Sequence, residues 1–194
     1  FTTALALGSP DRPVSYAVPT GNFGDIFAGH VARHMGVPIK DLVIATNVND
    51  ILHRTLETGR YEVLGVEPTA SPSMDIQVSS NFERLLFEAA GKDAGEVSRL
   101  MESLKQSGAF TLSEPMWNYI RAGFSSGRTS EDETAGTIRQ TLAETGELLD
   151  PHTAVGYAVA RRLAEHDVPM ITLATAHPAK FPDAVERASG VRPD

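Results

Sequence analysis

The sequence predicts an α/β fold built on a parallel sheet, and three observations indicate it. A strand-like segment at 14–18 runs through a glycine-bearing turn into a helical pattern, and a continuous apolar run follows at 42–46. After residue 152 the order helix, strand, helix returns. Strands alternating with helices imply right-handed crossovers and a sheet that helices cover.

The first predicted crossover begins with the strand at 14–18. The next segment, 23–34, carries apolar residues at the spacing of one helix face, and Gly36 and Pro38 stop the pattern. We therefore expect a helix that packs one face against the sheet.

The apolar run at 42–46 has the composition of a strand that is buried on both faces. A helix over 50–57 is expected next. Asn47 or Asn49 is its expected cap, because asparagine side chains accept hydrogen bonds from helical N–H groups, and Gly59 ends it.

The middle of the chain differs from its ends. Residues 68–74 form an irregular passage with two prolines, and 79–146 has a mostly helical pattern. Ser130 and Glu133 have the spacing of a capping box before the helix that ends near Gly146.

The last part predicts a helix over 152–165, a buried strand over 170–174 and a helix that begins near Pro178. We interpret residues 1–194 as a single incomplete α/β domain with a mostly helical excursion at about 79–146. The chain opens on a phenylalanine and stops soon after a predicted helix, so we expect it to be a piece of a longer polypeptide.

Composition excludes several classes of protein. The 17 basic and 25 acidic residues give a net charge of −8, which argues against a nucleic-acid partner. No apolar run approaches the ~20 residues that cross a bilayer, so no membrane partner is expected. The chain has no cysteine, which excludes disulfides and thiolate metal sites and fits the cytoplasm.

The turn from Gly21 to Asp25 is the main candidate site. Two glycines let the backbone approach an anion, and the following helix adds the positive end of its dipole. The turn matches neither GxGxxG nor GxxxxGK[ST], so an ordinary strand-to-helix turn stays an open alternative. Asp25 would repel a phosphate, so we expect it to point away and to cap the helix.

Histidines form two further candidates. His30 and His34 are four residues apart on one helix, but no third ligand is evident, so no metal site is expected. His152 is a candidate general acid or base. The alternative, that Asp150 and Thr153 are capping residues around a structural turn, is favoured.

Thr175 and His177 follow the predicted strand at 170–174. Ligands of open α/β sheets gather at the carboxyl ends of strands, so this pair is a better functional candidate than the first two histidines.

Six segments, in unbroken order from about Val14 to Gly190, together resemble the bacterial and fungal branch of the threonine synthase family. They read PTGNFGD, ATNVND, SPSMDI, SNFER, DPHTAV and TAHPAKF. The resemblance implies a partial fold type II architecture, similar to the tryptophan synthase β subunit. It also implies the cofactor pyridoxal 5′-phosphate and the conversion of O-phospho-L-homoserine and water to L-threonine and phosphate.

Two sets of site residues are carried over from the family. The loop of Gly21, Asn22, Phe23 and Gly24 holds the cofactor phosphate, and Thr175 faces the pyridine nitrogen. A neutral hydroxyl does not hold a proton on that nitrogen as an aspartate would. The ring is then a more moderate electron sink, which suits elimination and replacement.

The resemblance assigns no catalytic residue to this chain. The family's Schiff-base lysine lies upstream of the phosphate loop, and none of the four lysines matches its motif: Lys40, Lys92, Lys105 and Lys180. The missing N-terminal part of the same protein is therefore an expected partner, and the chain alone is expected to be inactive. A noncatalytic module that binds a phosphate ligand, from a truncated paralogue, and a purely structural domain stay as alternatives.

Overall fold

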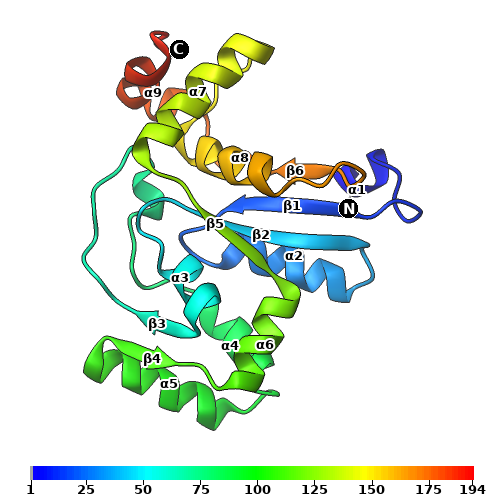
Figure 1. The fold of residues 1–194 in the computed structure, drawn as a ribbon, viewed down its shortest axis with the longest axis vertical. Coiled ribbons are helices and arrows are strands. Elements are labelled where there is room, and N and C mark those ends of the chain that lie inside the picture. Colours follow the sequence, from blue (N-terminus) through cyan, green and yellow to red (C-terminus); the bar gives the residue numbers. More distant parts are fainter. Residues whose placement is uncertain (1) are drawn as a thin grey trace.

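The computed structural model describes residues 2–194, and its centre is a parallel sheet of four strands in the order β5-β2-β1-β6 (Figure 1). Val18 of β1 pairs with Ile44 of β2, and Ala17 pairs with Thr172 of β6 on the other side. The strands are β1 (Val14–Pro19), β2 (Ile39–Thr46), β5 (Ser125–Arg128) and β6 (Met170–Thr172). The predicted α/β architecture is thus confirmed.

The alternation of side chains along the two central strands assigns each face of the sheet to different helices. On one face Val18, Leu42 and Ile44 join the large core cluster with α2 (Gly24–His34) and α3 (Ile51–Thr58). On the other face Ala17 and Val43 pack against α8 (Pro151–Leu163). Both central strands are therefore buried on both sides, as the apolar run at 42–46 predicts for β2.

The helix α8 lies close to the sheet because glycines meet larger side chains at the contact. A Cβ atom added to Gly156 would lie 2.9 Å from Cγ of Pro19 in β1. One added to Gly127 of β5 would lie 2.6 Å from a methyl group of Val159. Neither distance is tolerated by real side chains, so the interface depends on these glycines.

The helix after β2 confirms one expected boundary and corrects another. Gly59 ends α3 in the left-handed conformation, with φ of 72°. The N-cap is Asp50, which makes no side-chain cap hydrogen bond. Neither Asn47 nor Asn49 caps the helix, because Oδ1 of Asn47 accepts from Asn49 N at 2.8 Å and Oδ1 of Asn49 accepts from Glu67 N at 2.9 Å.

Residues 79–146 are mostly helical, as expected, but they also return a strand to the main sheet. The helices are α4 (Phe82–Ala89), α5 (Ala94–Ser107), α6 (Glu114–Gly123) and α7 (Glu131–Thr145). The added strand, β5, has the sequence SSGR and no apolar residue, so its hydrophobic pattern gave no signal. A short antiparallel pair lies beside α5, formed by β3 (Arg60–Glu62) and β4 (Ala109–Thr111).

Both ends of α7 are formed by the residues that the sequence predicted. Ser130 and Glu133 form the complete capping box of α7, and Gly146 ends that helix with φ of 78°. The remaining elements are the helix α1 (Thr2–Ala6), the 3₁₀ turns η1 (Pro72–Met74) and η2 (Pro178–Lys180), and the helix α9 (Pro182–Ser189). Among the described residues, no helix has both the length and the hydrophobicity to cross a membrane.

Candidate functional site

The two segments expected to bind cofactor leave the sheet at the same edge. Gly21 follows β1, and Thr175 follows its neighbour β6. The last residues paired between these two strands are Ala17 and Thr172. Gly21 and Thr175 each follow this pair by a few residues, so both lie near the same end of the sheet. This is the carboxyl edge, where open α/β sheets bind their ligands.

Most backbone N–H groups of the Gly21–Gly24 loop have no acceptor among the residues that the structure describes. Phe23 N donates to Ser80 O at 2.8 Å, but among residues 2–194 no partner is found for the N–H groups of Gly21, Asn22 and Gly24. Phe23, as N-cap of α2, provides no side-chain cap. Free donors at the positive end of an 11-residue helix make a site with the chemistry to hold a phosphate.

The expected cap of this helix is not formed. Asp25 lies exposed in the first turn of α2 and makes no cap hydrogen bond. Its carboxylate therefore acts on the helix only through the dipole, and it leaves the N–H groups free.

The side chain of Phe23 anchors the loop in the core. It is fully buried, in an edge-to-face contact with Phe82 at 5.2 Å and beside Phe124 at 5.8 Å. Its ring therefore faces the interior of the protein, and its N–H group is already paired with Ser80. Asn22, in contrast, is exposed and accepts a hydrogen bond from Ser80 N at 3.3 Å.

The two glycines of the loop have different surroundings. A Cβ atom at Gly21 would lie 2.9 Å from Ser73 O and 3.0 Å from Cα of Met74, so the turn η1 packs directly on the loop. At Gly24 the nearest atom would be Nδ2 of Asn81, at 3.7 Å. Close packing therefore requires a glycine at position 21. At Gly24 no atom packs closely, so space stays open above the N-terminus of α2.

The carbonyl of Gly21 is fixed from the opposite side by Ser79. Its Oγ donates to Gly21 O at 2.6 Å, and Ser79 N donates to Tyr61 Oη at 2.8 Å. Tyr61 is buried against Phe110, and burial raises the pKa of its hydroxyl to about 12. A chain of hydrogen bonds thus connects the loop to an aromatic cluster.

A loop that contains the SPSMDI segment is held by two asparagines that follow β2. Asn47 Nδ2 donates to Asp75 Oδ1 at 2.9 Å, and Asn49 Nδ2 donates to the same oxygen at 3.0 Å. Thr69 N donates to the other oxygen, Oδ2, at 2.8 Å. Asp75 is therefore the centre of a network that positions η1 against Gly21.

The turn at Asp150 has the capping role favoured by the sequence. Its carboxylate accepts from His152 N at 2.8 Å and from Thr153 N at 3.3 Å. Burial disfavours the charge of Asp150, but the hydrogen bonds from His152 and Thr153 outweigh it and hold the pKa of this carboxyl below its usual value.

His152 also positions the turn beside the loop, which the sequence did not indicate. Its Nδ1 lies 2.9 Å from Asp150 Oδ1, and its Nε2 accepts a hydrogen bond from Ser73 N at 3.2 Å. This arrangement places the proton on Nδ1 and connects α8 to η1. Any residue other than proline has a backbone N–H group, so no residue type marks Ser73 as the partner. The hydrogen bond between Ser73 and His152 was therefore not predictable from the sequence.

Thr175 is exposed, and the strand before it is shorter than expected. The buried strand predicted over 170–174 is β6, which spans Met170–Thr172 and is only half-buried. It has one strand neighbour within the described part of the chain, which explains its exposure. His177 Nδ1 accepts from Ala179 N at 3.2 Å and so caps η2.

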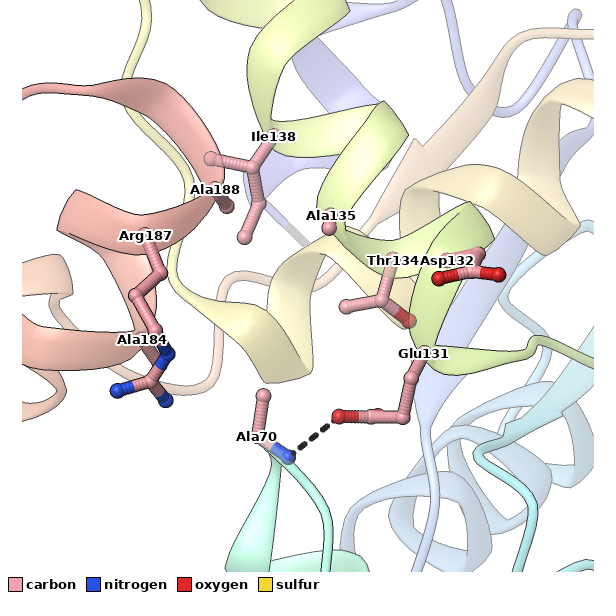
Figure 2. Close-up of a pocket in the computed structure, with 9 residues that line it drawn as sticks. All are labelled: Ala70, Glu131, Asp132, Thr134, Ala135, Ile138, Ala184, Arg187 and Ala188. Atoms are coloured by element: carbon pink, nitrogen blue, oxygen red, sulfur yellow. Dashed lines mark hydrogen bonds between the residues drawn. The ribbon is translucent and has the colours of Figure 1, made fainter.

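A separate pocket of about 220 Å³ lies between α7, α9 and the backbone at Ala70 (Figure 2). Glu131 closes one side, because its Oε2 accepts from Ala70 N at 2.9 Å. Asp132 and Arg187 add charge of both signs to its lining. Neither the Gly21–Gly24 loop nor Thr175 contributes to this lining.

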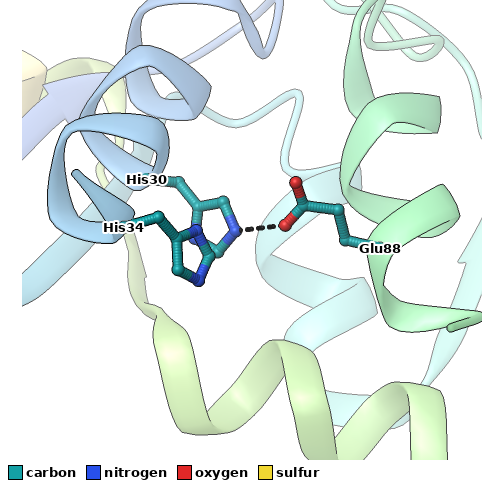
Figure 3. A group of neighbouring side chains, drawn as sticks. All are labelled: His30, His34 and Glu88. Carbon is teal, nitrogen blue, oxygen red and sulfur yellow. Dashed lines mark hydrogen bonds and ion pairs between the residues drawn. The ribbon is translucent and has the colours of Figure 1, made fainter. Parts of the chain in front are cut away.

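The histidine pair of α2 has a third polar neighbour that the sequence did not indicate. Glu88 of α4 faces both rings, and its Oε2 lies 2.7 Å from His30 Nε2 (Figure 3). Burial lowers the pKa of His30. For Glu88, burial opposes ionisation, but the hydrogen bond from His30 lowers its pKa.

Comparisons with known proteins agree with this architecture. A family model described as "Threonine synthase, C-terminal" matches residues 153–194. A threonine synthase of Pseudomonas aeruginosa is 51% identical over 189 residues, which are 97% of this chain and 40% of that protein. The chain thus spans about 40% of the length of the curated relatives it matches.

Solved structures give the same result. The crystal structure of a threonine synthase from Brucella melitensis with bound PLP matches with a TM-score of 0.97 and 64% identity, over 99% of this chain and 41% of that one. The yeast enzyme matches with a TM-score of 0.87 and 42% identity, over 94% of this chain and 39% of that one. The fold is part of the fold type II architecture, and the chain belongs to the threonine synthase family.

Proposed function

We propose that this chain is the part of a threonine synthase that holds pyridoxal 5′-phosphate by its phosphate and ring nitrogen. The reaction would convert O-phospho-L-homoserine and water to L-threonine and phosphate, in the cytoplasm. The observation that carries the proposal is the uncapped N-terminus of α2, where three N–H groups have no partner within residues 2–194, at the sheet edge where Thr175 also emerges. The name and bound PLP of the Brucella melitensis structure support it.

The residues fit such a cofactor. The N–H groups of Gly21, Asn22 and Gly24 would bind the phosphate, and the buried Phe23 ring would hold the loop rigid. When bound, the cofactor supplies an electron sink for the replacement reaction. The hydroxyl of Thr175 would face the ring nitrogen without protonating it, which limits electron withdrawal.

We further propose that the Schiff-base lysine lies outside these 194 residues. All four lysines here are exposed, and Lys40 forms an ion pair with Glu165. Lys180 is nearest in sequence to Thr175, but it lies in η2 with its side chain exposed. A longer protein would then supply the base and complete the active site. The alternative of a noncatalytic phosphate module has no observation that favours it over this proposal.

The phosphate loop is tested by an isosteric pair, Gly24→Asp and Gly24→Asn, in the full-length protein. Both side chains fit, because a Cβ atom at Gly24 meets nothing closer than 3.7 Å. The aspartate adds a negative charge near the phosphate, so we expect about tenfold or greater loss of cofactor affinity relative to the asparagine variant. The same charge favours the helix dipole, so folding stability does not fall. Equal cofactor affinity in the two variants would contradict the loop assignment.

The ring contact is tested by Thr175→Val, with Thr175→Ser as the matched control that keeps the hydroxyl. We expect the valine variant to lose turnover more than cofactor retention, and the serine variant to keep most of both. Loss of cofactor from the valine variant, with normal activity of what remains loaded, would contradict this role.

A further inference from the structure

The cluster of His30, His34 and Glu88 lies apart from the proposed cofactor loop. His30 is six residues along α2 from Gly24, which is about 9 Å along the helix axis. The function proposed above makes no use of this cluster. Its three side chains offer two imidazole nitrogens and one carboxylate oxygen, all within 4.8 Å of one another.

From this geometry we propose that His30, His34 and Glu88 bind a divalent first-row transition metal, zinc above all. Two histidines and a carboxylate are a ligand set typical of zinc sites that keep one position open. Imidazole nitrogen suits zinc, whereas magnesium and calcium prefer sites made only of oxygen.

The distances fit coordination with small side-chain movements. Tetrahedral ligands 2.0–2.2 Å from zinc are roughly 3.3 Å apart. His30 Nε2 and Glu88 Oε2 are 2.7 Å apart, so they separate slightly on binding. The two histidine rings are 4.3 Å apart between centroids and nearly perpendicular, at 84°. The His34 nitrogen closes the site by moving at most about 1.5 Å, which its exposed side chain permits.

The surrounding helices favour a cation. His34 is the last residue of α2, and Glu88 lies in the last turn of α4 (Figure 3). The C-terminal end of a helix carries partial negative charge, so the ends of α2 and α4 both favour a cation between His34 and Glu88. An open pocket of about 400 Å³ borders His34 and Glu88 and has room for water as a further ligand.

Two positive groups lie nearby and do not block the site. Arg33 Nη2 is 3.5 Å from His30 Nδ1, but its short hydrogen bond, at 2.7 Å, goes to Gly123 O. Coordination through Nε2 of His30 places the ring proton on Nδ1, so the long hydrogen bond from Arg33, which can only donate, is lost, while Arg33 keeps its carbonyl partner. Lys92 lines the open pocket with an exposed side chain, so its ammonium group can stay in solvent.

The experiment is a titration of the metal-free, full-length protein with zinc, followed by cobalt(II) as the spectroscopic probe. We expect His34→Ala to lower zinc affinity at least about a hundredfold, because it removes one of three ligands. Glu88→Gln keeps the shape and the hydrogen bond but weakens the oxygen ligand, so we expect a loss of at least about tenfold. Both variants should also lose the visible cobalt bands of a low-coordinate site.

His166→Ala is the matched control. His166 Nδ1 lies 2.8 Å from Asp167, so this pair has an imidazole and a carboxylate in contact but no second histidine, and both side chains are almost fully exposed. We expect it to bind zinc like the unmodified protein. Equal zinc affinity and equal cobalt spectra in His34→Ala and His166→Ala would overturn the proposal. The result is independent of the cofactor, because neither readout requires turnover.

Discussion

Gly21→Ala is expected to destabilise the protein, because the contact between the loop and η1 has no space for a methyl group. The new Cβ would lie 2.9 Å from Ser73 O and 3.0 Å from Cα of Met74, whereas ordinary contacts begin at 3.4 Å. The backbone of η1 must therefore move by about half an ångström. His152 resists this movement through its hydrogen bond with Ser73 N, and Asp75 resists it through the asparagine network.

Overpacking of this kind costs about 1–3 kcal/mol, which for a chain of this length lowers the melting temperature by about 2–12 °C. The assay is urea unfolding, with Gly24→Ala as the control. At Gly24 the nearest atom is 3.7 Å away, so we expect a change within about 0.5 kcal/mol. If the two variants have equal unfolding free energies, the packing argument for Gly21 is wrong.

Three further variants test the sources of folding stability. The carboxylate of Asp150 has a pKa held below its usual 3.8, so its contribution is present above that pH and is lost as the pH falls through the lowered pKa. Asp150→Asn should flatten the decline in unfolding free energy measured between about pH 5 and pH 2. Tyr61→Phe leaves the buried N–H of Ser79 unpaired and should cost about 1–3 kcal/mol in urea unfolding. Because burial raises the pKa of Tyr61 to about 12, stability should decline above pH 10 in the unmodified protein and less so in this variant. Ser130→Ala removes the capping box of α7 and should cost about 1 kcal/mol in thermal unfolding; no change would show that the box adds nothing.

Local signals in the sequence predicted much of the fold. The glycines that end α3 and α7 and the capping box at Ser130 act through neighbouring residues, so their effect is visible in a short stretch of sequence. The central strands were equally visible, because burial on both faces requires a continuous apolar run such as 42–46.

Features that depend on distant contacts were not predictable in the same way. The strand β5 has no apolar residue, and its place at the sheet edge is set by pairing with β2. Asn47 and Asn49 have the chemistry of caps, but their side-chain oxygens accept from Asn49 N and the distant Glu67 N, while their amide nitrogens donate to Asp75. The proximity of Glu88 to the α2 histidines likewise exists only after the helices pack.

The candidate site was also predictable only in part. Physical reasoning from the turn gave an anion site as one of two alternatives, and the structure adds the free N–H groups that favour it. The roles of Gly21–Gly24 and Thr175 towards the cofactor came from the family resemblance and stay predictions until the variants above are measured.

The hydrogen bond from Ser79 to the Gly21 carbonyl has a consequence for binding kinetics and affinity. A carbonyl and the next N–H belong to one rigid peptide plane and point in opposite directions. By holding Gly21 O, the serine prevents the plane from flipping, so the N–H of Asn22 keeps its direction before any anion arrives. A loop with this restraint needs no reorientation on encounter, and the entropy of ordering it is lost during folding instead of during binding.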